Sequence, residues 1–270
     1  MTKKLPFPLI GLILTCLVFG LTVSLFNHTQ TANITFKTSE LTHLDSIEKQ
    51  ELTMWHNDEV KFVYFTFDDG PSRNTSELLD ILKAEDVPGT FFLLGDSIER
   101  VADSKELVAR IANEGHYLGL HSMTHVYDTL YKGPNAPQNF VNEMFETQEL
   151  IAEYANGFKS TLVRAPYGTG GGTFTPNHVT AVANAGLKVW DWDVDSVDWS
   201  DSPSQIIENL KTFTEIKADQ QHLIVLFHEK DTTLQALPQA IKYYRDLGYE
   251  FAAYDPDHHV VSNFMQSDEL

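Results

Sequence analysis

The sequence has very little cysteine and few positive charges for its length. Its single cysteine, Cys16, lies in an apolar run near the N-terminus, so the rest of the chain cannot form a disulfide framework. Lysine and arginine number 19 against 38 aspartates and glutamates, which gives a formal net charge of −19. A surface of this sign repels nucleic acid and anionic lipid, so we expect no nucleic-acid partner. Acidity also maintains solubility, and by itself it identifies no partner.

The chain has no internal repeat and no long low-complexity segment. Lys3 and Lys4 precede an apolar run, from about residue 5 to residue 26, that contains no charged residue. About 20 helical residues cross a bilayer core, and the lysine pair marks the side that stays in the cytoplasm. We therefore expect residues 1–30 to be a single-pass membrane anchor, with the rest of the chain outside the cytoplasmic membrane. A cleaved signal peptide, which would give a secreted or periplasmic protein, is the alternative.

Residues 31–58 are polar and mixed and predict a tether, which leads into a folded domain over residues 59–262. Short β-rich runs predict strands at 61–67, 89–94, 116–120, 161–164, 187–194, 222–227 and 249–254. Amphipathic stretches predict helices at 75–84, 104–114, 140–155, 176–185, 203–214 and 234–247. This alternation predicts an α/β fold with a parallel sheet covered by helices. Seven strands fit either a closed barrel or an open sheet.

Polar side chains of the kinds that do chemistry follow five of the predicted strands. They are Asp68 and Asp69, His121, Arg164, Asp195 and His228. In barrels built from parallel strands, functional residues collect at the carboxyl ends of the strands. We therefore expect these side chains to form one site.

Metal binding is the first function that these residues suggest. His121 and His125 are four residues apart, which would place both imidazoles on one side of a helical turn. Structural histidines often share this spacing, so a third ligand is needed. Asp68 and Asp69 are the nearest donors, because two adjacent carboxylates in a tight turn repel each other unless a cation or an arginine offsets them. A solvated acidic loop is the alternative interpretation.

Three protein ligands with an open fourth position are typical of a catalytic zinc site. Hydrolysis at such a site needs a base for the attacking water and an acid for the leaving group. One carboxylate of the aspartate pair can bind the metal while the other serves as the base. His228 is a candidate acid, and Asp195 can hold its imidazole charged and oriented. A buried histidine at a strand end is by itself more often structural.

Five motifs in this sequence occur in the order found in the polysaccharide deacetylases, the NodB-homology carbohydrate esterases of family 4. They are TFDDG at 66–70, HSMTH at 121–125, RAPYG at 164–168, DSVDW at 195–199 and LFH at 226–228. The chain resembles this family over about residues 60–255. The resemblance implies a distorted (β/α)7 barrel, and one divalent metal per chain, usually zinc, held by an Asp-His-His site.

The resemblance also implies a role for each matching position. Asp68 matches the general base, and Asp69, His121 and His125 match the metal ligands. Arg164 matches the arginine that pairs with the base, His228 the general acid, and Asp195 the carboxylate that tunes this acid. The backbone N–H of Tyr167 matches a donor to the oxyanion, and Trp199 and Leu226 match the wall around the acetyl methyl group.

The sequence departs from the family pattern at two positions. Ala165 stands where family members commonly have proline, and Glu229 stands where they commonly have aspartate. Neither position has a catalytic role in the family, so we expect little effect on the chemistry. Three glycines at 170–172 predict a flexible rim beside Tyr167, which bears on substrate identity rather than on activity.

The expected function is the metal-dependent hydrolysis of N-acetyl groups on GlcNAc-type units of an extracytoplasmic polysaccharide, either peptidoglycan or an exported β-1,4 glycan. Deacetylation of chitooligosaccharide or of O-acetyl xylan is the alternative within the family. A glycosidase with paired carboxylates would leave the histidine pair and Arg164 without a role. A non-catalytic carbohydrate-binding protein would be expected to have lost a ligand or the acid, and all of them are present.

Overall fold

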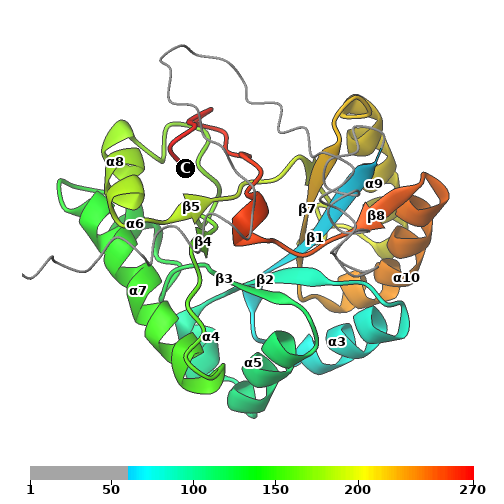
Figure 1. Cartoon of the computed structure of the whole chain (residues 1–270), viewed down its shortest axis with the longest axis horizontal. Coiled ribbons are helices and arrows are strands. Elements are labelled where there is room, and N and C mark those ends of the chain that lie inside the picture. The colour runs from blue at the N-terminus through cyan, green and yellow to red at the C-terminus, as the bar shows by residue number, and fades with distance from the viewer. Residues whose placement is uncertain (1–59) are drawn as a thin grey trace, which may run out of the picture. The chain divides into compact units, whose positions relative to one another are not determined.

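The computed structural model describes residues 60–270, which form a curled parallel sheet with helices packed on its outer face (Figure 1). The strands are β1 (Lys61–Gly70), β2 (Gly89–Leu93), β3 (Tyr117–Leu120), β4 (Leu162–Val163), β5 (Lys188–Val189), β6 (Val194–Asp195), β7 (His222–His228) and β8 (Tyr249–Phe251). The helices are α3 (Thr75–Ala84), α4 (Gly95–Arg100), α5 (Ser104–Asn113), α6 (Tyr127–Tyr131), α7 (Ala136–Tyr154), α8 (Pro176–Asn184), α9 (Pro203–Ile216), α10 (Asp231–Asp246) and the 3-10 helix η2 (Pro256–His258).

The predicted anchor and tether lie outside the described residues. Between residues 60 and 270, no helix is both long enough and apolar enough to span a bilayer.

The strands pair in the order β5-β4-β3-β2-β1-β7-β6, all in parallel, and β8 adds a further parallel partner to β1. The central pair is β1 and β7, which run in register from Phe62 opposite His222 to Asp68 opposite His228. The end strands β5 and β6 are consecutive in the sequence, yet no ladder between them occurs among the described residues. The sheet is therefore curled and open rather than a fully closed barrel.

Most predicted elements are confirmed. All six predicted helices are present, and α3 begins and ends at the predicted residues. The strand predicted at 187–194 is wrong as a single element, because it is divided into β5 and β6 with residues 190–193 between them. The short helices α4 and α6 were not predicted, since five or six residues are too few to show a clear helical period.

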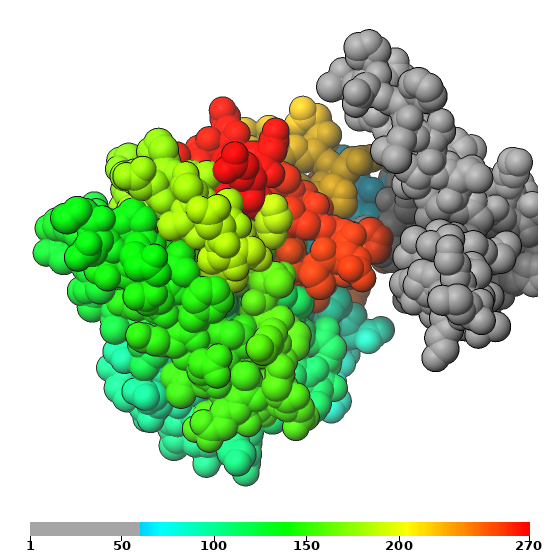
Figure 2. All heavy atoms as spheres, turned by 60° about the vertical axis from the view of Figure 1, so that its left-hand side comes forward, coloured from blue at the N-terminus to red at the C-terminus, as the bar shows by residue number. Residues whose placement is uncertain are grey.

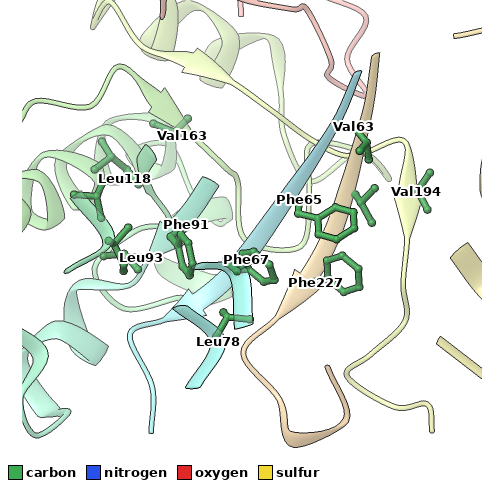
Figure 3. Close-up of a cluster of buried hydrophobic side chains, with 14 of the residues drawn as sticks. Val63, Phe65, Phe67, Leu78, Phe91, Leu93, Leu118, Val163, Val194 and Phe227 are labelled. Carbon is green, nitrogen blue, oxygen red and sulfur yellow. The ribbon is translucent and has the colours of Figure 1, made fainter. Parts of the chain in front are cut away.

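The core has two layers because successive side chains of a strand point to opposite faces of the sheet. From β1, Phe65 and Phe67 point outward and pack against Phe227 of β7, with ring centroids 5.1 and 5.7 Å apart (Figure 3). The outer layer continues to the helices through residues such as Leu78 of α3. An inner layer on the concave face includes Tyr64 and other large side chains, namely Phe62, Phe92, Trp190 and Tyr254.

The alternation along β1 also positions the polar residues at its end. Thr66 and Asp68 share the inner face with Phe62 and Tyr64, and both polar side chains are buried. On β7, the same alternation places Leu226 and His228 on the inner face with Ile224. The site residues of β1 and β7 therefore meet inside the curl of the sheet.

The chain beyond residue 262 packs on the same domain. Ser262 pairs with Trp190 in an isolated parallel bridge, and the Leu270 side chain is fully buried. The sequence prediction ended the domain at residue 262.

Candidate active site

Asp68 and Arg164 form a buried ion pair at the centre of the concave face. Arg164 Nη1 donates to Asp68 Oδ1 at 2.9 Å, and the arginine side chain is fully buried. Nη1 also donates to the Thr66 hydroxyl at 2.5 Å. Nε and Nη2 donate to backbone carbonyls, Nε to Trp190 at 3.0 Å and Nη2 to Asp191 at 2.9 Å. Each of the three nitrogens of this buried cation has a partner, so the guanidinium holds one oxygen of Asp68 in a fixed position.

Asp69 reaches the same site only because β1 is irregular at its end. Strict alternation would direct Asp68 and Asp69 to opposite faces of the sheet. Asp69 instead has a left-handed backbone, with φ of 70°, and the pairing of β1 with β2 shifts register between Asp68 and Gly70. A single positive φ with a bulge re-aims a side chain. Both carboxylates then lie within 3.7 Å of His121 Nε2, at 3.7 Å from Asp68 Oδ2 and 3.5 Å from Asp69 Oδ1.

His121 and His125 converge, but not on a helical turn as the sequence spacing predicted. Residues 121–125 are a non-helical loop, with φ of 73° at Ser122 and 59° at His125. Glu143 of α7 holds this loop by accepting from the Thr124 backbone N–H at 2.9 Å and from the Thr124 hydroxyl. The helical prediction was wrong because polar side chains, rather than helical backbone bonds, satisfy the loop.

The tautomer of His121 is set by its surroundings. His121 Nδ1 lies 2.8 Å from the carbonyl oxygen of Arg164, which can only accept, so this nitrogen carries the proton. The other ring nitrogen, Nε2, lies 3.5 Å from Asp69 Oδ1. A hydrogen bond of this kind orients metal-binding histidines.

Asp69, His121 and His125 together fit a divalent metal. One ligand atom from each lies within 4.8 Å of the others, and Asp69 Oδ1 is 3.7 Å from His125 Nε2. Asp69 Oδ1 is buried and has no hydrogen-bond partner among the described residues. A buried carboxylate oxygen without a donor is costly unless a cation satisfies it.

The pKa shifts of Asp69 and His125 agree with such a site. Burial opposes ionisation of Asp69, but the imidazoles of His121, His228 and His125 outweigh burial and lower its pKa. Burial, with His121 beside it, lowers the pKa of His125. An ionised carboxylate and a neutral imidazole are the forms in which Asp and His side chains bind metals.

His228 is held by Asp198, and the assignment of this contact to Asp195 was wrong. His228 Nδ1 lies 2.8 Å from Asp198 Oδ1, and the His228 backbone N–H donates to Asp198 Oδ2 at 2.6 Å. The Thr233 hydroxyl also donates to this carboxylate. Burial favours the neutral imidazole, but the hydrogen bond and charge of Asp198 outweigh burial, and the pKa of His228 is raised.

Asp195 lies beside this pair without bonding to it. Its Oδ1 accepts a hydrogen bond from the backbone N–H of Val197 at 2.8 Å. Burial raises the pKa of Asp195, and the Val197 hydrogen bond and the charge of His228 only partly offset this rise. Both aspartates belong to the motif at 195–199. The chain reverses at Val197, with φ of 56°, and this reversal directs the second aspartate to His228.

The remaining expected site residues surround this centre. Tyr167 has a left-handed backbone, with φ of 67°, and its ring centroid is 4.6 Å from that of His125. Within residues 60–270, no protein group accepts a hydrogen bond from its backbone N–H. Leu226 is buried on the inner face of β7, whereas the Trp199 side chain, next to Asp198, is 62% exposed.

Glu229 ties the ends of β1 and β7 together. Its Oε2 accepts from the Ser72 hydroxyl at 2.6 Å and from the Thr75 hydroxyl, while its carbonyl accepts from Asn74 Nδ2 at 3.1 Å. A Cβ atom on Gly70 would lie 2.2 Å from Glu229 Oε1, so a side chain at the turn after Asp69 would have to displace this buried carboxyl. Sequence reasoning did not find this role, because no spacing rule links residues 70–75 to residue 229.

Comparisons with known proteins agree with this geometry. The sequence model of the family described as polysaccharide deacetylase matches residues 56–190. The chain is 37% identical over 232 residues to a peptidoglycan-N-acetylglucosamine deacetylase of Bacillus cereus, covering 83% of this chain and 80% of that protein. It is 34% identical over 173 residues to a chitooligosaccharide deacetylase of Rhizobium leguminosarum, covering 62% of this chain and 67% of that protein.

A solved structure is also similar. The crystal structure of a polysaccharide deacetylase from Bacillus cereus superposes with a TM-score of 0.71 at 37% identity, covering 78% of this chain and all of that one. Fold, site and sequence therefore point to the same group of enzymes.

Proposed function

Because the chain belongs to the polysaccharide deacetylase family, we propose that it hydrolyses N-acetyl groups on GlcNAc-type units of an extracytoplasmic polysaccharide, peptidoglycan above all, with a bound divalent metal. The observation that carries the proposal is Asp69 Oδ1, which lies near His121 and His125 and has no hydrogen-bond partner within residues 60–270. Two charged pairs, Asp68–Arg164 and His228–Asp198, lie beside it. The B. cereus relative, named for peptidoglycan, supports the substrate.

Asp69, His121 and His125 would hold the metal, for which we propose zinc, one per chain. When bound, such a metal acts as a Lewis acid toward the acetyl carbonyl and makes water more acidic. Asp and His ligands with an open position suit zinc.

The acid and base are assigned to the two pairs. Asp68 has one oxygen bound to Arg164, and its other oxygen faces the site, where it can accept the proton of the attacking water. His228, with Nδ1 bound to Asp198, presents Nε2 as the donor to the leaving amine. The backbone N–H of Tyr167 donates to the oxygen that becomes negative in the transition state. Asp68 thus takes up a proton and His228 gives one, as the hydrolysis of an amide requires.

Acetate release tests this function. Peptidoglycan, chitin oligomers and acetylxylan are each incubated with the full chain, with and without a chelator. Acetate from N-acetylated peptidoglycan, lost with chelator and restored by Zn²⁺, is expected. Acetate from acetylxylan alone would make the protein an O-acetyl esterase. Binding to glycan without acetate from any substrate would make it a carbohydrate-binding protein.

We also propose that residues 1–30 anchor the protein and place residues 60–270 outside the cytoplasmic membrane. The proposal rests on the lysine pair and the uncharged apolar run that follows it. Retention in the membrane fraction after a high-salt wash is expected. A soluble protein whose N-terminus lies near residue 30 would instead identify a cleaved signal peptide.

A further inference from the structure

The C-terminal segment, residues 260–270, lies against residues 188–191, at the end of β5. The carbonyls of Trp190 and Asp191 in this stretch accept hydrogen bonds from the Arg164 guanidinium. The carbonyl of Val260 accepts from Trp190 Nε1 at 2.6 Å, and the carbonyl of Ser262 accepts from the Asp191 backbone N–H at 2.8 Å. The Glu269 carbonyl accepts from Lys188 Nζ at 3.0 Å. Figure 2 shows this red segment beside the yellow-green surface that includes α8. The segment is therefore bonded to residues 188–191 near both of its ends.

Asp191 joins this segment to the loop that carries Tyr167. The Asp191 side chain is fully buried, and its carboxylate accepts from the Thr169 backbone N–H at 2.9 Å, from the Thr169 hydroxyl, and from the Phe264 backbone N–H at 2.7 Å. Arg164 donates to the backbone carbonyl of Asp191 rather than to this carboxylate. A buried carboxylate is retained only when such donors satisfy it, so the loop and the C-terminal segment are held by one acceptor group.

The Phe264 side chain packs on the same loop. Its ring meets that of Trp192 edge-on, with centroids 5.1 Å apart. A Cβ atom on Gly168 would lie 2.9 Å from the Trp192 ring and 3.2 Å from the Phe264 ring, and one on Gly170 would lie 3.2 Å from Phe264. The two aromatic rings thus close over the glycines that follow Tyr167.

The packing of Phe264 and Trp192 on this loop constrains the backbone conformation of Tyr167. Tyr167 and Gly168 both have positive φ, 67° and 77°, and a tyrosine in this region is strained. Such a conformation persists when the surrounding structure fixes it. The next residue along the chain, Thr169, is the one anchored to Asp191, and the Tyr167 N–H has no protein acceptor among residues 60–270.

We propose that Asp191 and Phe264 are positioning residues, which hold the loop at 165–170 so that the Tyr167 N–H points at the oxyanion. The inference rests on the proposed function, because it assigns a transition-state role to that N–H. Neither side chain touches the reacting atoms in this scheme. Both act through the loop.

The main test is Phe264→Ala in the full chain. Phe264 is 46% exposed, so the domain is expected to fold without its ring. Phe145, on α7, is 43% exposed, and Phe145→Ala is the matched control. Removing one oxyanion donor costs about 10²–10³ in kcat, so loosening it is expected to cost about tenfold. KM should change by less than about threefold, since the interaction belongs to the transition state.

Two further measurements separate positioning from general damage. Hydrogen exchange of the Thr169 amide should accelerate in Phe264→Ala but not in Phe145→Ala, with or without bound metal. Phe264→Leu, which restores apolar packing, should recover most of kcat. Metal content should stay at the wild-type value in all three variants. The backbone N–H groups of Thr169 and Phe264 bond to different oxygens of Asp191, so Asp191→Asn leaves an acceptor for only one of them and should also accelerate exchange.

Wild-type kcat together with unchanged exchange in Phe264→Ala would overturn the inference. An equal loss in Phe145→Ala, or a loss that follows metal content, would also overturn it. The exchange measurement needs no acetate release, so a wild-type chain without deacetylase activity would contradict the proposed function while the loop anchor was still measured.

Discussion

The acid–base half and the metal half of the site differ in how far the protein alone satisfies them. In the acid–base half, Arg164 donates a hydrogen bond to Asp68. The Asp198 carboxylate is hydrogen-bonded to the backbone N–H and to the ring Nδ1 of His228. In the metal half, Asp69 Oδ1 is buried without a donor among the described residues, and it faces two imidazole nitrogens at 3.5 and 3.7 Å.

The difference indicates what each half needs. The acid–base half is preorganised by hydrogen bonds within the protein, so its geometry is expected to survive loss of the metal. The metal half brings together groups whose unpaired atoms a cation would satisfy. Substitutions should therefore separate the halves, because one set changes metal content and the other changes only the chemistry.

The largest effect is expected from breaking the metal half with Asp69→Asn. The amide is a weaker ligand than the carboxylate, so the variant should hold less than one metal per chain and lose nearly all acetate release. Excess Zn²⁺ should restore part of the activity by mass action. Metal analysis of the purified protein and an acetate assay measure both. His125→Ala should behave alike but resist rescue, and full occupancy with normal activity in either variant would contradict the ligand assignment.

A smaller effect is expected from Asp68→Asn, which alters the acid–base half. The substitution preserves shape and removes the base, so turnover should fall by roughly 10²–10⁴, the usual contribution of general base catalysis. Metal content should stay at one per chain, which distinguishes this variant from Asp69→Asn. If Asp68→Asn lost its metal while Asp69→Asn kept it, the two roles would be reversed.

The smallest effect, and the one that sharpens the comparison most, is expected from Asp198→Asn. Asp198 raises the pKa of His228, so His228 keeps its proton to higher pH than an ordinary histidine. Without that carboxylate the pKa falls, and the alkaline limb of the kcat/KM profile should move to lower pH, with activity at neutral pH reduced about tenfold. Metal content should not change.

Asp195→Asn is the matched control for this shift. Asp195 feels the charge of His228 but forms its side-chain hydrogen bond with Val197, so its removal should move the alkaline limb less than removal of Asp198. An equal or larger shift in Asp195→Asn would return the tuning role to Asp195.

Much of the site could be read from the sequence because strand ends are local features. An apolar strand followed directly by Asp68 and Asp69, or by His228, is recognisable in a few residues, and parallel pairing brings such ends together. The ordered motifs added the roles that spacing left open. The backbone that delivers these side chains was not readable, as the non-helical loop at 121–125 shows.

By itself the sequence determined the strand–helix alternation, the edge of the sheet where the site lies, and the residue types that meet there. Only the tertiary structure decided that Asp198 rather than Asp195 contacts His228, that Glu229 joins two strand ends, and that Asp191 anchors the loop of Tyr167. Periodicity records which face of an element is buried. Side chains are redirected by residues with a left-handed backbone, such as Asp69 and Val197, and by contacts between distant segments. Neither effect can be predicted from the hydrophobic period of the sequence.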